Sequence, residues 1–220
     1  MGYGIKLKIW GDYACFSRPE MKVERVSYDV ITPSSARGIL EAIYWKPAIR
    51  WVIDEIKVIN PIKFENIKRN ELSGIISSNV VKRAYLGSKD VNLYQNTKKD
   101  IVQRGSMILK DVCYYISAHF ELTDKVGEGD TVEKHYNIAL RRAKKGQCFH
   151  RPYLGCREFS AQFELADKDD EQSFYVNLEK DLGYMLWDID FKNESLPIFF
   201  RPTMKDGVIS IPDLQRGDIS

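Results

Sequence analysis

This sequence of 220 residues predicts an α+β fold of the ferredoxin-like or RRM-like kind, with a β-rich C-terminal extension. Two patterns lead to that fold class. Segments of alternating apolar residues and segments of helical apolar spacing follow in the order β-α-β-β-α-β, which is the order of this fold. Short strand-like segments then fill the C-terminal part. We expect an RRM-like domain over residues 1–165, with an insertion near 63–106, and a small β-rich subdomain over 166–220.

The first half of the unit is a strand, a helix and a second strand. Residues 3–10 alternate apolar and polar side chains, which is typical of a half-buried strand. After a loop, a helix is predicted to begin at 32–35, where a proline suits the first helical position. It must end near 44–46, because Pro47 disfavours helical geometry in the residue before it. Residues 49–59 are the predicted second strand.

The second half of the unit repeats this pattern. Residues 107–122 and 156–165 are predicted strands, and residues 131–146 between them are a predicted helix. Thr131 suits the N-cap of this helix and Gly146 suits its C-cap. The apolar stripe of the helix is formed by Val132, Tyr136, Ala139 and Ala143.

Two further segments are predicted from composition and turn signals. Residues 63–106 are rich in Lys, Asn, Ser and Gly, so we expect an insertion that is partly flexible and contains a short hairpin. Residues 172–214 are expected to form short strands. Among them, the run Lys205-Asp206-Gly207-Val208 has the composition of a hairpin turn.

The composition is that of an ordinary soluble globular protein. Apolar residues make up 44% of the chain and charged residues 29%, and the net charge is only +2, so overall charge does not indicate a nucleic-acid binder. The four cysteines lack the spacing of a zinc site. Neither a signal peptide nor a membrane-spanning run is present, so we expect a cytoplasmic protein with reduced thiols.

The motifs of several enzyme classes are absent from the sequence. It contains no phosphate-binding P-loop, no dinucleotide-binding glycine motif and no serine-hydrolase elbow. The three histidines, His119, His135 and His150, are scattered and have no carboxylates at metal-ligand spacing. We therefore do not expect an NTPase, a hydride-transfer enzyme or a metal-dependent nuclease, and we predict no metal and no cofactor.

The predicted helix over 131–146 carries the most informative polar residues. Lys134 and His135 stand in its first turn, where free backbone N–H groups favour a phosphate that these two side chains could bind and protonate. Its last turn holds a run of four cations. This run suits the negative end of the helix dipole without any function, and it equally suits contact with RNA.

Basic residues interleaved with aromatic residues mark two stretches, 18–46 and 134–157. Aromatic rings stack on bases, and arginine and lysine pair with phosphates, so both stretches favour RNA binding. Composition alone does not decide between this interpretation and a solvated charged surface.

Longer segments of the sequence resemble a known family. Residues 11–47, which begin G-D-Y-A-C-F-S-R-P-E and end E-A-I-Y-W-K-P, resemble the N-terminal signature of the CRISPR-associated Cas-five family, a family of RAMP proteins, in its subtype I-C (Dvulg). The later blocks E-K-H-Y-N-I-A-L-R-R-A-K-K-G and Y-L-G-C-R-E-F resemble the same family in the same order. The resemblance covers nearly the whole chain.

This resemblance implies a fold and an activity. The fold is RRM-like with a β-rich C-terminal extension. The activity is that of a metal-independent, sequence-specific endoribonuclease that cuts the repeat hairpin of precursor CRISPR RNA and keeps the 5′ handle of the mature crRNA. The protein then becomes a subunit of the surveillance complex (Cascade), beside the backbone and large subunits, and meets target DNA through that complex.

Two alternatives remain open at this point. Other subtypes of the family are similar in fold but only hold the handle without cutting, so a non-catalytic handle-binding subunit is the main alternative. A general RNA-binding protein with an RRM-like fold, outside CRISPR biology, is the more distant one.

The resemblance also implies which residues act. The tyrosine, lysine and histidine of the cutting subtype match Tyr44, Lys134 and His135. After the second helix the chain reads K-K-G-Q-C over 144–148, whereas many relatives carry a double glycine and more arginine. The basic residues that we expect to contact RNA are Arg18, Lys22, Arg25, Arg37, Lys46, Arg141, Arg142, Lys145 and Arg157.

Metal-free RNA cleavage generally begins when a 2′-OH attacks its own phosphate, which yields a 2′,3′-cyclic phosphate. His135 can exchange a proton near neutral pH, and Lys134 can neutralise the phosphorane. Tyr44 would position the 2′-OH. Helical spacing places it on one exposed face with Arg37 and Glu41, away from the apolar stripe. The sequence leaves the acid and base roles open.

Overall fold

The computed structural model describes residues 3–21, 23–166, 171–191 and 193–212. The chain divides into two compact units, one formed by Met1–Glu65 with Met107–Ser220 and the other by Asn66–Ser106. The predicted α+β class is confirmed as a mixed fold in which sheet dominates and helices are few. Within the described part of the chain, no helix has the length and apolar character needed to cross a membrane.

Among the described residues, the main sheet has nine strands. Seven follow in the order β6-β1-β5-β3-β11-β10-β7, and both β2 and β4 also pair with β5. The nine strands are β1 (Gly4–Ala14), β2 (Arg25–Val26), β3 (Ile49–Val58), β4 (Phe64–Leu72), β5 (Ile101–Leu122), β6 (Gln162–Leu165), β7 (Glu179–Asp181), β10 (Thr203–Lys205) and β11 (Val208–Ser210). A separate antiparallel pair is formed by β8 (Met185–Asp190) and β9 (Leu196–Phe200).

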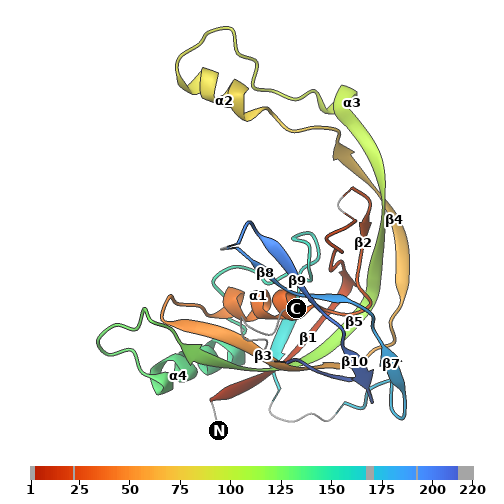
Figure 1. Ribbon diagram of the computed structural model, residues 1–220, viewed down its shortest axis with the longest axis vertical. Coiled ribbons are helices and arrows are strands. Elements are labelled where there is room, and N and C mark those ends of the chain that lie inside the picture. The colour runs from red at the N-terminus through yellow and green to blue at the C-terminus, as the bar shows by residue number, and fades with distance from the viewer. Residues whose placement is uncertain (1–2, 22, 167–170, 192, 213–220) are drawn as a thin grey trace. The chain divides into compact units, whose positions relative to one another are not determined.

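Helix α1 (Pro33–Ile43) lies where the sequence predicts it (Figure 1). The Thr32 hydroxyl caps its N-terminus by accepting a hydrogen bond from the Ser35 backbone N–H at 3.3 Å. The helix ends at Ile43, because Tyr44 already has an extended backbone with φ −152° and ψ 120°. This extended residue decides where the Tyr44 side chain points.

Helix α4 (Val132–Lys144) also confirms its predicted start. The Thr131 hydroxyl accepts a hydrogen bond from the Lys134 backbone N–H at 3.2 Å. Lys145 is the C-cap, and Gly146 follows with a positive φ of 62°. Lys134 and His135 therefore lie in the first turn, as predicted.

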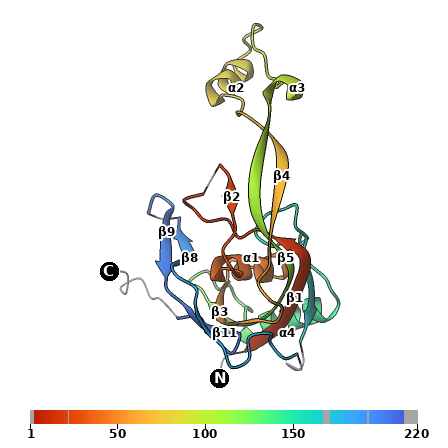
Figure 2. The ribbon, with the colours of Figure 1, turned by 90° about the vertical axis from the view of Figure 1, so that its right-hand side faces the viewer.

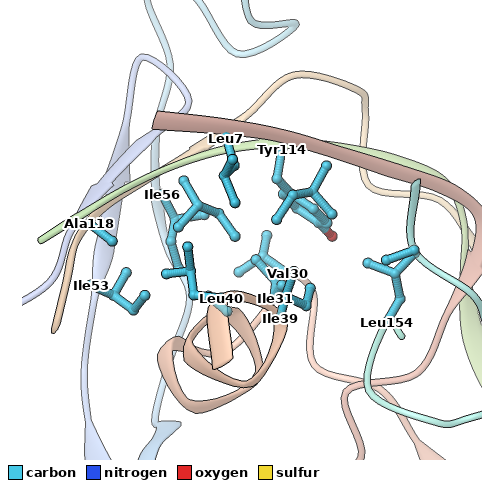
Figure 3. Close-up of a cluster of buried hydrophobic side chains, with 14 of the residues drawn as sticks. Leu7, Val30, Ile31, Ile39, Leu40, Ile53, Ile56, Tyr114, Ala118 and Leu154 are labelled. Atoms are coloured by element: carbon cyan, nitrogen blue, oxygen red, sulfur yellow. The ribbon is translucent and has the colours of Figure 1, made fainter. Parts of the chain in front are cut away.

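The core lies between α1 and one face of the sheet. Figure 3 shows α1 beneath the sheet strands, with apolar side chains from both filling the space between them. The labelled residues are Leu7, Val30, Ile31, Ile39, Leu40, Ile53, Ile56, Tyr114, Ala118 and Leu154. Helix α4 contributes Ala139 and Ala143 to the same buried cluster and contacts β1 and β6. The two helices thus share one core.

Three predicted strand boundaries are wrong. Strand β1 continues to Ala14 instead of ending at residue 10, and β5 begins at Ile101 instead of 107. Strand β6 begins only at Gln162, because the residues before it form turns. There the Leu154 N–H donates to the Phe159 carbonyl at 2.7 Å. Local apolar patterns do not show such backbone pairing.

The segment 63–106 contains more regular structure than its composition predicts. It holds β4, α2 (Ser78–Tyr85), α3 (Thr97–Asp100) and the first part of β5. The expected short hairpin is instead two long strands, β4 and β5, which run side by side in both views (Figures 1 and 2). Charged side chains support this ribbon, since Glu71 of β4 lies 3.4 Å from Arg69 and 3.6 Å from Arg104 of β5.

The C-terminal hairpin is confirmed at the predicted turn. Asp206 and Gly207 both have positive φ, 53° and 81°, and Lys205 pairs with Val208 across the turn. Strand β11 then pairs with β3, with Ile209 opposite Ile56. The C-terminal strands therefore extend the main sheet, and the predicted domain boundary at residue 165 stays a prediction.

Gly207 should be among the least replaceable residues of the fold. A Cβ at this position would clash with the Ser173 side chain, lie 3.0 Å from the Val58 carbonyl oxygen, and require the left-handed backbone of φ 81°. We expect Gly207→Ala to lower the free energy of unfolding by about 2–5 kcal/mol, measured by urea denaturation. Gly38→Ala is the control: in mid-helix, with no atom within 4 Å of its Cβ, it should gain about 0.5–1 kcal/mol. Equal changes in the free energy of unfolding for the two variants would contradict this account of Gly207.

Candidate active site

Tyr44 and His135 meet in the core. The Tyr44 hydroxyl lies 2.7 Å from His135 Nδ1, although the two residues are 91 positions apart in the sequence. Tyr44 is 2% exposed and His135 is 1% exposed. The fold therefore joins the end of α1 to the start of α4 through a single buried hydrogen bond.

The inward face of α4 differs from the predicted stripe. His135, Ala139 and Ala143 are its buried residues, whereas Val132 and Tyr136 are only partly buried. The two alanines are small enough for α1 to approach. The predicted stripe is therefore wrong in leaving out His135, whose ring occupies the inward face of the helix. His135, Ala139 and Ala143 follow i, i+4, i+8 spacing, which places them on one helical face. A search for apolar residues alone does not find this face, because His135 is polar.

Neighbouring aromatic residues fix the position of the pair. Phe120 of β5 meets the His135 ring edge to face, with centroids 6.3 Å apart and planes at 79°. The Trp51 indole N–H of β3 donates to the Tyr44 carbonyl at 2.8 Å. Trp51 and Phe120 are themselves register partners across β3 and β5. The sheet thus forms the floor beneath both candidate residues.

Arg142 secures the end of α1 from the neighbouring helix. Its guanidinium donates to the Ile43 carbonyl at 2.9 Å and lies 5.3 Å from the centroid of the Tyr44 ring. Helix α1 has no basic residue in its own last turn. Arg142 therefore supplies the positive charge that suits the C-terminus of α1.

Burial sets the protonation states of the pair. It lowers the pKa of His135, Lys134 and Lys46 act in the same direction, and Asp130 opposes them. Burial also raises the pKa of Tyr44, an effect that Arg142 opposes. Near neutral pH a protonated phenol thus faces a neutral imidazole. With the imidazole proton on Nε2, on the side of Asp130 Oδ1, Nδ1 accepts the hydrogen bond that the Tyr44 O–H donates.

Asp130 lies beside both candidate residues of α4, Lys134 and His135. Its Oδ1 accepts a hydrogen bond from the exposed Lys134 ammonium at 3.0 Å and lies 3.5 Å from His135 Nε2. Lys134 also donates to the Gly129 carbonyl at 3.2 Å. The Lys134 ammonium holds the pKa of Asp130 below its ordinary value. Tyr44, His135, Lys134 and Asp130 therefore form one polar cluster.

Sequence reasoning missed Asp130 and Trp45. Asp130 precedes the N-cap and stands four residues before Lys134, which is the spacing of an ion pair on one helical face. Trp45 follows Tyr44 directly and is 51% exposed, which is unusual for so large an aromatic side chain. An exposed indole next to a candidate catalytic residue suits stacking on a base.

Four of the predicted RNA contacts have partners within the protein: Arg142, described above, and the three that follow. Arg18 lies over the Tyr28 ring at 4.5 Å, and Arg25 contacts Glu158 at 3.4 Å. Arg37 forms a bidentate ion pair with Asp188 of β8. The expected exposed face shared by Arg37 and Tyr44 is wrong, because the extended backbone turns the Tyr44 side chain into the core.

The remaining predicted contacts lie at the surface or outside the described residues. The exposed ones are Lys46, Arg141, Lys145 and Arg157. Lys22 lies outside the described residues. Of the other two histidines, His119 Nδ1 lies 2.7 Å from Asp54, and His150 is exposed. None of these positions by itself tests a role in RNA binding.

Comparisons with known proteins show which family this chain resembles. The family described as CRISPR-associated protein (Cas_Cas5), in its Cas5d model, matches residues 4–212. The CRISPR pre-crRNA endoribonuclease Cas5d of Mannheimia succiniciproducens is 52% identical over 216 residues, which cover 96% of each chain. The protein of that name from Thermus thermophilus is 37% identical and covers 94% of this chain and 91% of its own.

A solved structure extends the comparison to the fold. The crystal structure of a CRISPR-associated protein superposes with a TM-score of 0.71 at 26% sequence identity, covering 98% of this chain and 95% of its own. The match in sequence and the match in fold both run nearly end to end. This chain therefore belongs to the CRISPR-associated Cas5 family, in its Cas5d group.

Proposed function

We propose that this chain is a pre-crRNA endoribonuclease that cuts the repeat hairpin and keeps the 5′ handle of the product. Relatives at 52% and 37% identity carry the name CRISPR pre-crRNA endoribonuclease and match it over almost their whole length. We further propose that β6-β1-β5-β3, with α1 and α4, is a ferredoxin-like unit, since that strand order fits it.

The observation that carries the catalytic proposal is the hydrogen bond between the Tyr44 hydroxyl and His135 Nδ1. It joins two groups able to exchange protons, and the Lys134 ammonium is in the same first turn of α4. The exposed side chains of Trp45, Lys46 and Lys134 flank the pair in sequence and mark the surface from which we expect RNA to approach.

In the proposed reaction, the proton of the attacking 2′-OH passes to the Tyr44 oxygen while the phenolic proton passes to His135 Nδ1. The 2′-oxygen bonds to phosphorus, the bond from phosphorus to the 5′-oxygen breaks, and a 2′,3′-cyclic phosphate remains. Lys134 neutralises the phosphorane and gives a proton to the departing 5′-oxygen. Exchange with solvent then restores both residues.

The same assignment defines the partners. We propose that the protein acts in the cytoplasm on precursor CRISPR RNA, keeps the mature handle, and joins the backbone and large subunits of Cascade, through which it meets target DNA. The alternative is a handle-binding subunit that does not cut. The deep burial of Tyr44 and His135 is the observation that favours this alternative, because a buried hydrogen bond between them can serve to stabilise the core alone. Cleavage of repeat RNA distinguishes the two.

Cleavage should need no divalent metal. We expect the rate on repeat RNA to be unchanged in excess EDTA, because the proton transfers use only side chains. The upstream product should end in a 2′,3′-cyclic phosphate, detected by mass spectrometry and by resistance to 3′-end ligation until phosphatase treatment. Loss of cleavage in EDTA that Mg²⁺ restores would rule out this mechanism.

Substitutions in the pair should separate cutting from binding. Tyr44→Phe and His135→Gln each remove one partner of the proton relay, so the single-turnover cleavage rate should fall about 10²–10⁴-fold. Affinity for the repeat hairpin, measured by fluorescence anisotropy, should stay within about threefold. Thermal unfolding confirms that each variant is folded, and His119→Gln is the matched control. A Tyr44→Phe variant that cleaves at the wild-type rate would contradict the proposed proton relay.

Arg142 and Arg141 should differ in what they do. Arg142→Ala removes the guanidinium from the end of α1, so the free energy of unfolding should fall by about 1–2 kcal/mol. Arg141 is exposed, so Arg141→Ala should change stability by less than about 0.5 kcal/mol and reduce the salt dependence of RNA binding by about one phosphate contact. Urea denaturation and a salt titration of RNA affinity measure both effects. The reverse pattern would contradict the assignment.

A further inference from the structure

We propose that Asp130 is a positioning residue for the reaction, which completes a row Tyr44–His135–Asp130 and orients the imidazole for proton transfer. This inference rests on the proposed function. The row is defined by two distances: 2.7 Å from the Tyr44 hydroxyl to His135 Nδ1, and 3.5 Å from His135 Nε2 to Asp130 Oδ1. The carboxylate thus lies on the opposite side of the ring from the phenol.

The Asp130 carboxylate is held in place by its own loop. Its Oδ2 accepts a hydrogen bond from the Gly127 backbone N–H at 3.2 Å, and its backbone N–H donates to the Gly127 carbonyl at 3.1 Å. The next residue, Thr131, is the N-cap of α4. A short turn therefore ties the carboxylate to the start of the helix that carries His135.

The Asp130 carboxylate lies beside His135 Nε2, the ring nitrogen that does not bond to Tyr44. When Tyr44 donates to Nδ1, the ring proton lies on Nε2, a buried atom with no hydrogen-bond partner among the described residues. Asp130 Oδ1 faces it. As Nδ1 takes the phenolic proton, the ring becomes an imidazolium with a proton on each nitrogen, and a carboxylate beside Nε2 stabilises that charge.

Lys134 couples the contact between Asp130 and His135 to binding of the RNA substrate. In the free protein the same Oδ1 accepts from the Lys134 ammonium at 3.0 Å. A phosphate of the RNA competes for that ammonium, because lysine forms charge-assisted hydrogen bonds with phosphate as well as with carboxylate. Once Lys134 turns to the phosphate, the Asp130 carboxylate is left to His135 alone. Substrate binding would thus raise the proton affinity of His135 at the moment a base is needed.

Several charged groups face the imidazole and must be counted in any test. The charged ones are Asp130 and Lys134 from the start of α4, Lys46 from the segment after α1, and Arg142, whose guanidinium lies 5.3 Å from the centroid of the Tyr44 ring. The Tyr44 phenol beside Nδ1 is neutral. Phe120 of β5 closes another side of the ring without charge. Asp130 alone among the four charged residues favours the protonated ring.

The test compares Asp130→Asn with Asp124→Asn in the full-length protein. Asparagine keeps the shape and an oxygen acceptor for the Gly127 N–H, removes the charge and replaces the other oxygen with an amide NH2. Asp124 lies exposed in the same loop and loses the same charge. The chain has three histidines, so their imidazole signals can be assigned and titrated individually by NMR. Cleavage of repeat RNA and hairpin affinity are measured on the same samples.

We expect the His135 titration to move to lower pH in Asp130→Asn and to stay at the wild-type position in Asp124→Asn. Cleavage should fall at least about 10-fold in Asp130→Asn only, with hairpin affinity within about threefold. Asp130→Glu, which keeps the charge, should restore part of the rate. Thermal unfolding checks that each variant is folded.

Two results would overturn the proposal. One is a His135 titration that Asp130→Asn leaves unchanged, and the other is a shifted titration with wild-type cleavage. If the wild-type protein does not cut repeat RNA at all, the proposed function fails. The NMR titration then still shows whether Asp130 acts on His135, so the two failures are distinguishable.

Discussion

The hydrogen bond between Tyr44 and His135 is possible only because two helices stop and start at the same place on one core. Helix α1 ends at Ile43, and the extended backbone of Tyr44 turns its ring toward α4. Helix α4 begins at Val132, after the N-cap Thr131, so His135 falls in its first turn on the inward face. Ala139 and Ala143 continue that face with small side chains. A shift of either boundary by one residue would rotate one partner away from the other, because each helical residue advances by about 100°.

The sheet fixes this arrangement from below. Strand β5 pairs with β1 on one side and with β3 on the other, and its Phe120 stands under the His135 ring. Trp51, the register partner of Phe120 on β3, donates its indole N–H to the Tyr44 carbonyl. A one-residue slip of either strand would send these side chains to the opposite face. The register of the central strands is therefore a requirement of the site as well as of the core.

Local sequence signals predict the parts of this fold that local chemistry determines. The helix start at 32–35, the N-cap Thr131 and the turn at Asp206-Gly207 were identifiable, because each satisfies a backbone requirement within a few residues. The ribbon of β4 and the first part of β5 was not identifiable, because β4 alternates only between exposed and half-buried residues and its half-buried face is mostly charged, so it shows no apolar alternation. The burial of His135 was missed for a related reason: a polar residue on an inward face breaks the apolar stripe that marks that face. The resemblance identified Tyr44 and His135, but only the fold supplies their partner Asp130.

Burial of Tyr44 and His135 constrains how this candidate site could transfer protons without a metal. A neutral imidazole against a neutral phenol suits the core, whereas the imidazolium that proton transfer creates does not, because charging a buried group loses its hydration. A relay through Tyr44 therefore requires a compensating negative charge close to the ring. Asp130 has that position but is engaged by Lys134 in the free protein. In the proposed mechanism, a phosphate that draws Lys134 away would leave the Asp130 charge beside His135, so the RNA itself would complete the electrostatics of its own cleavage.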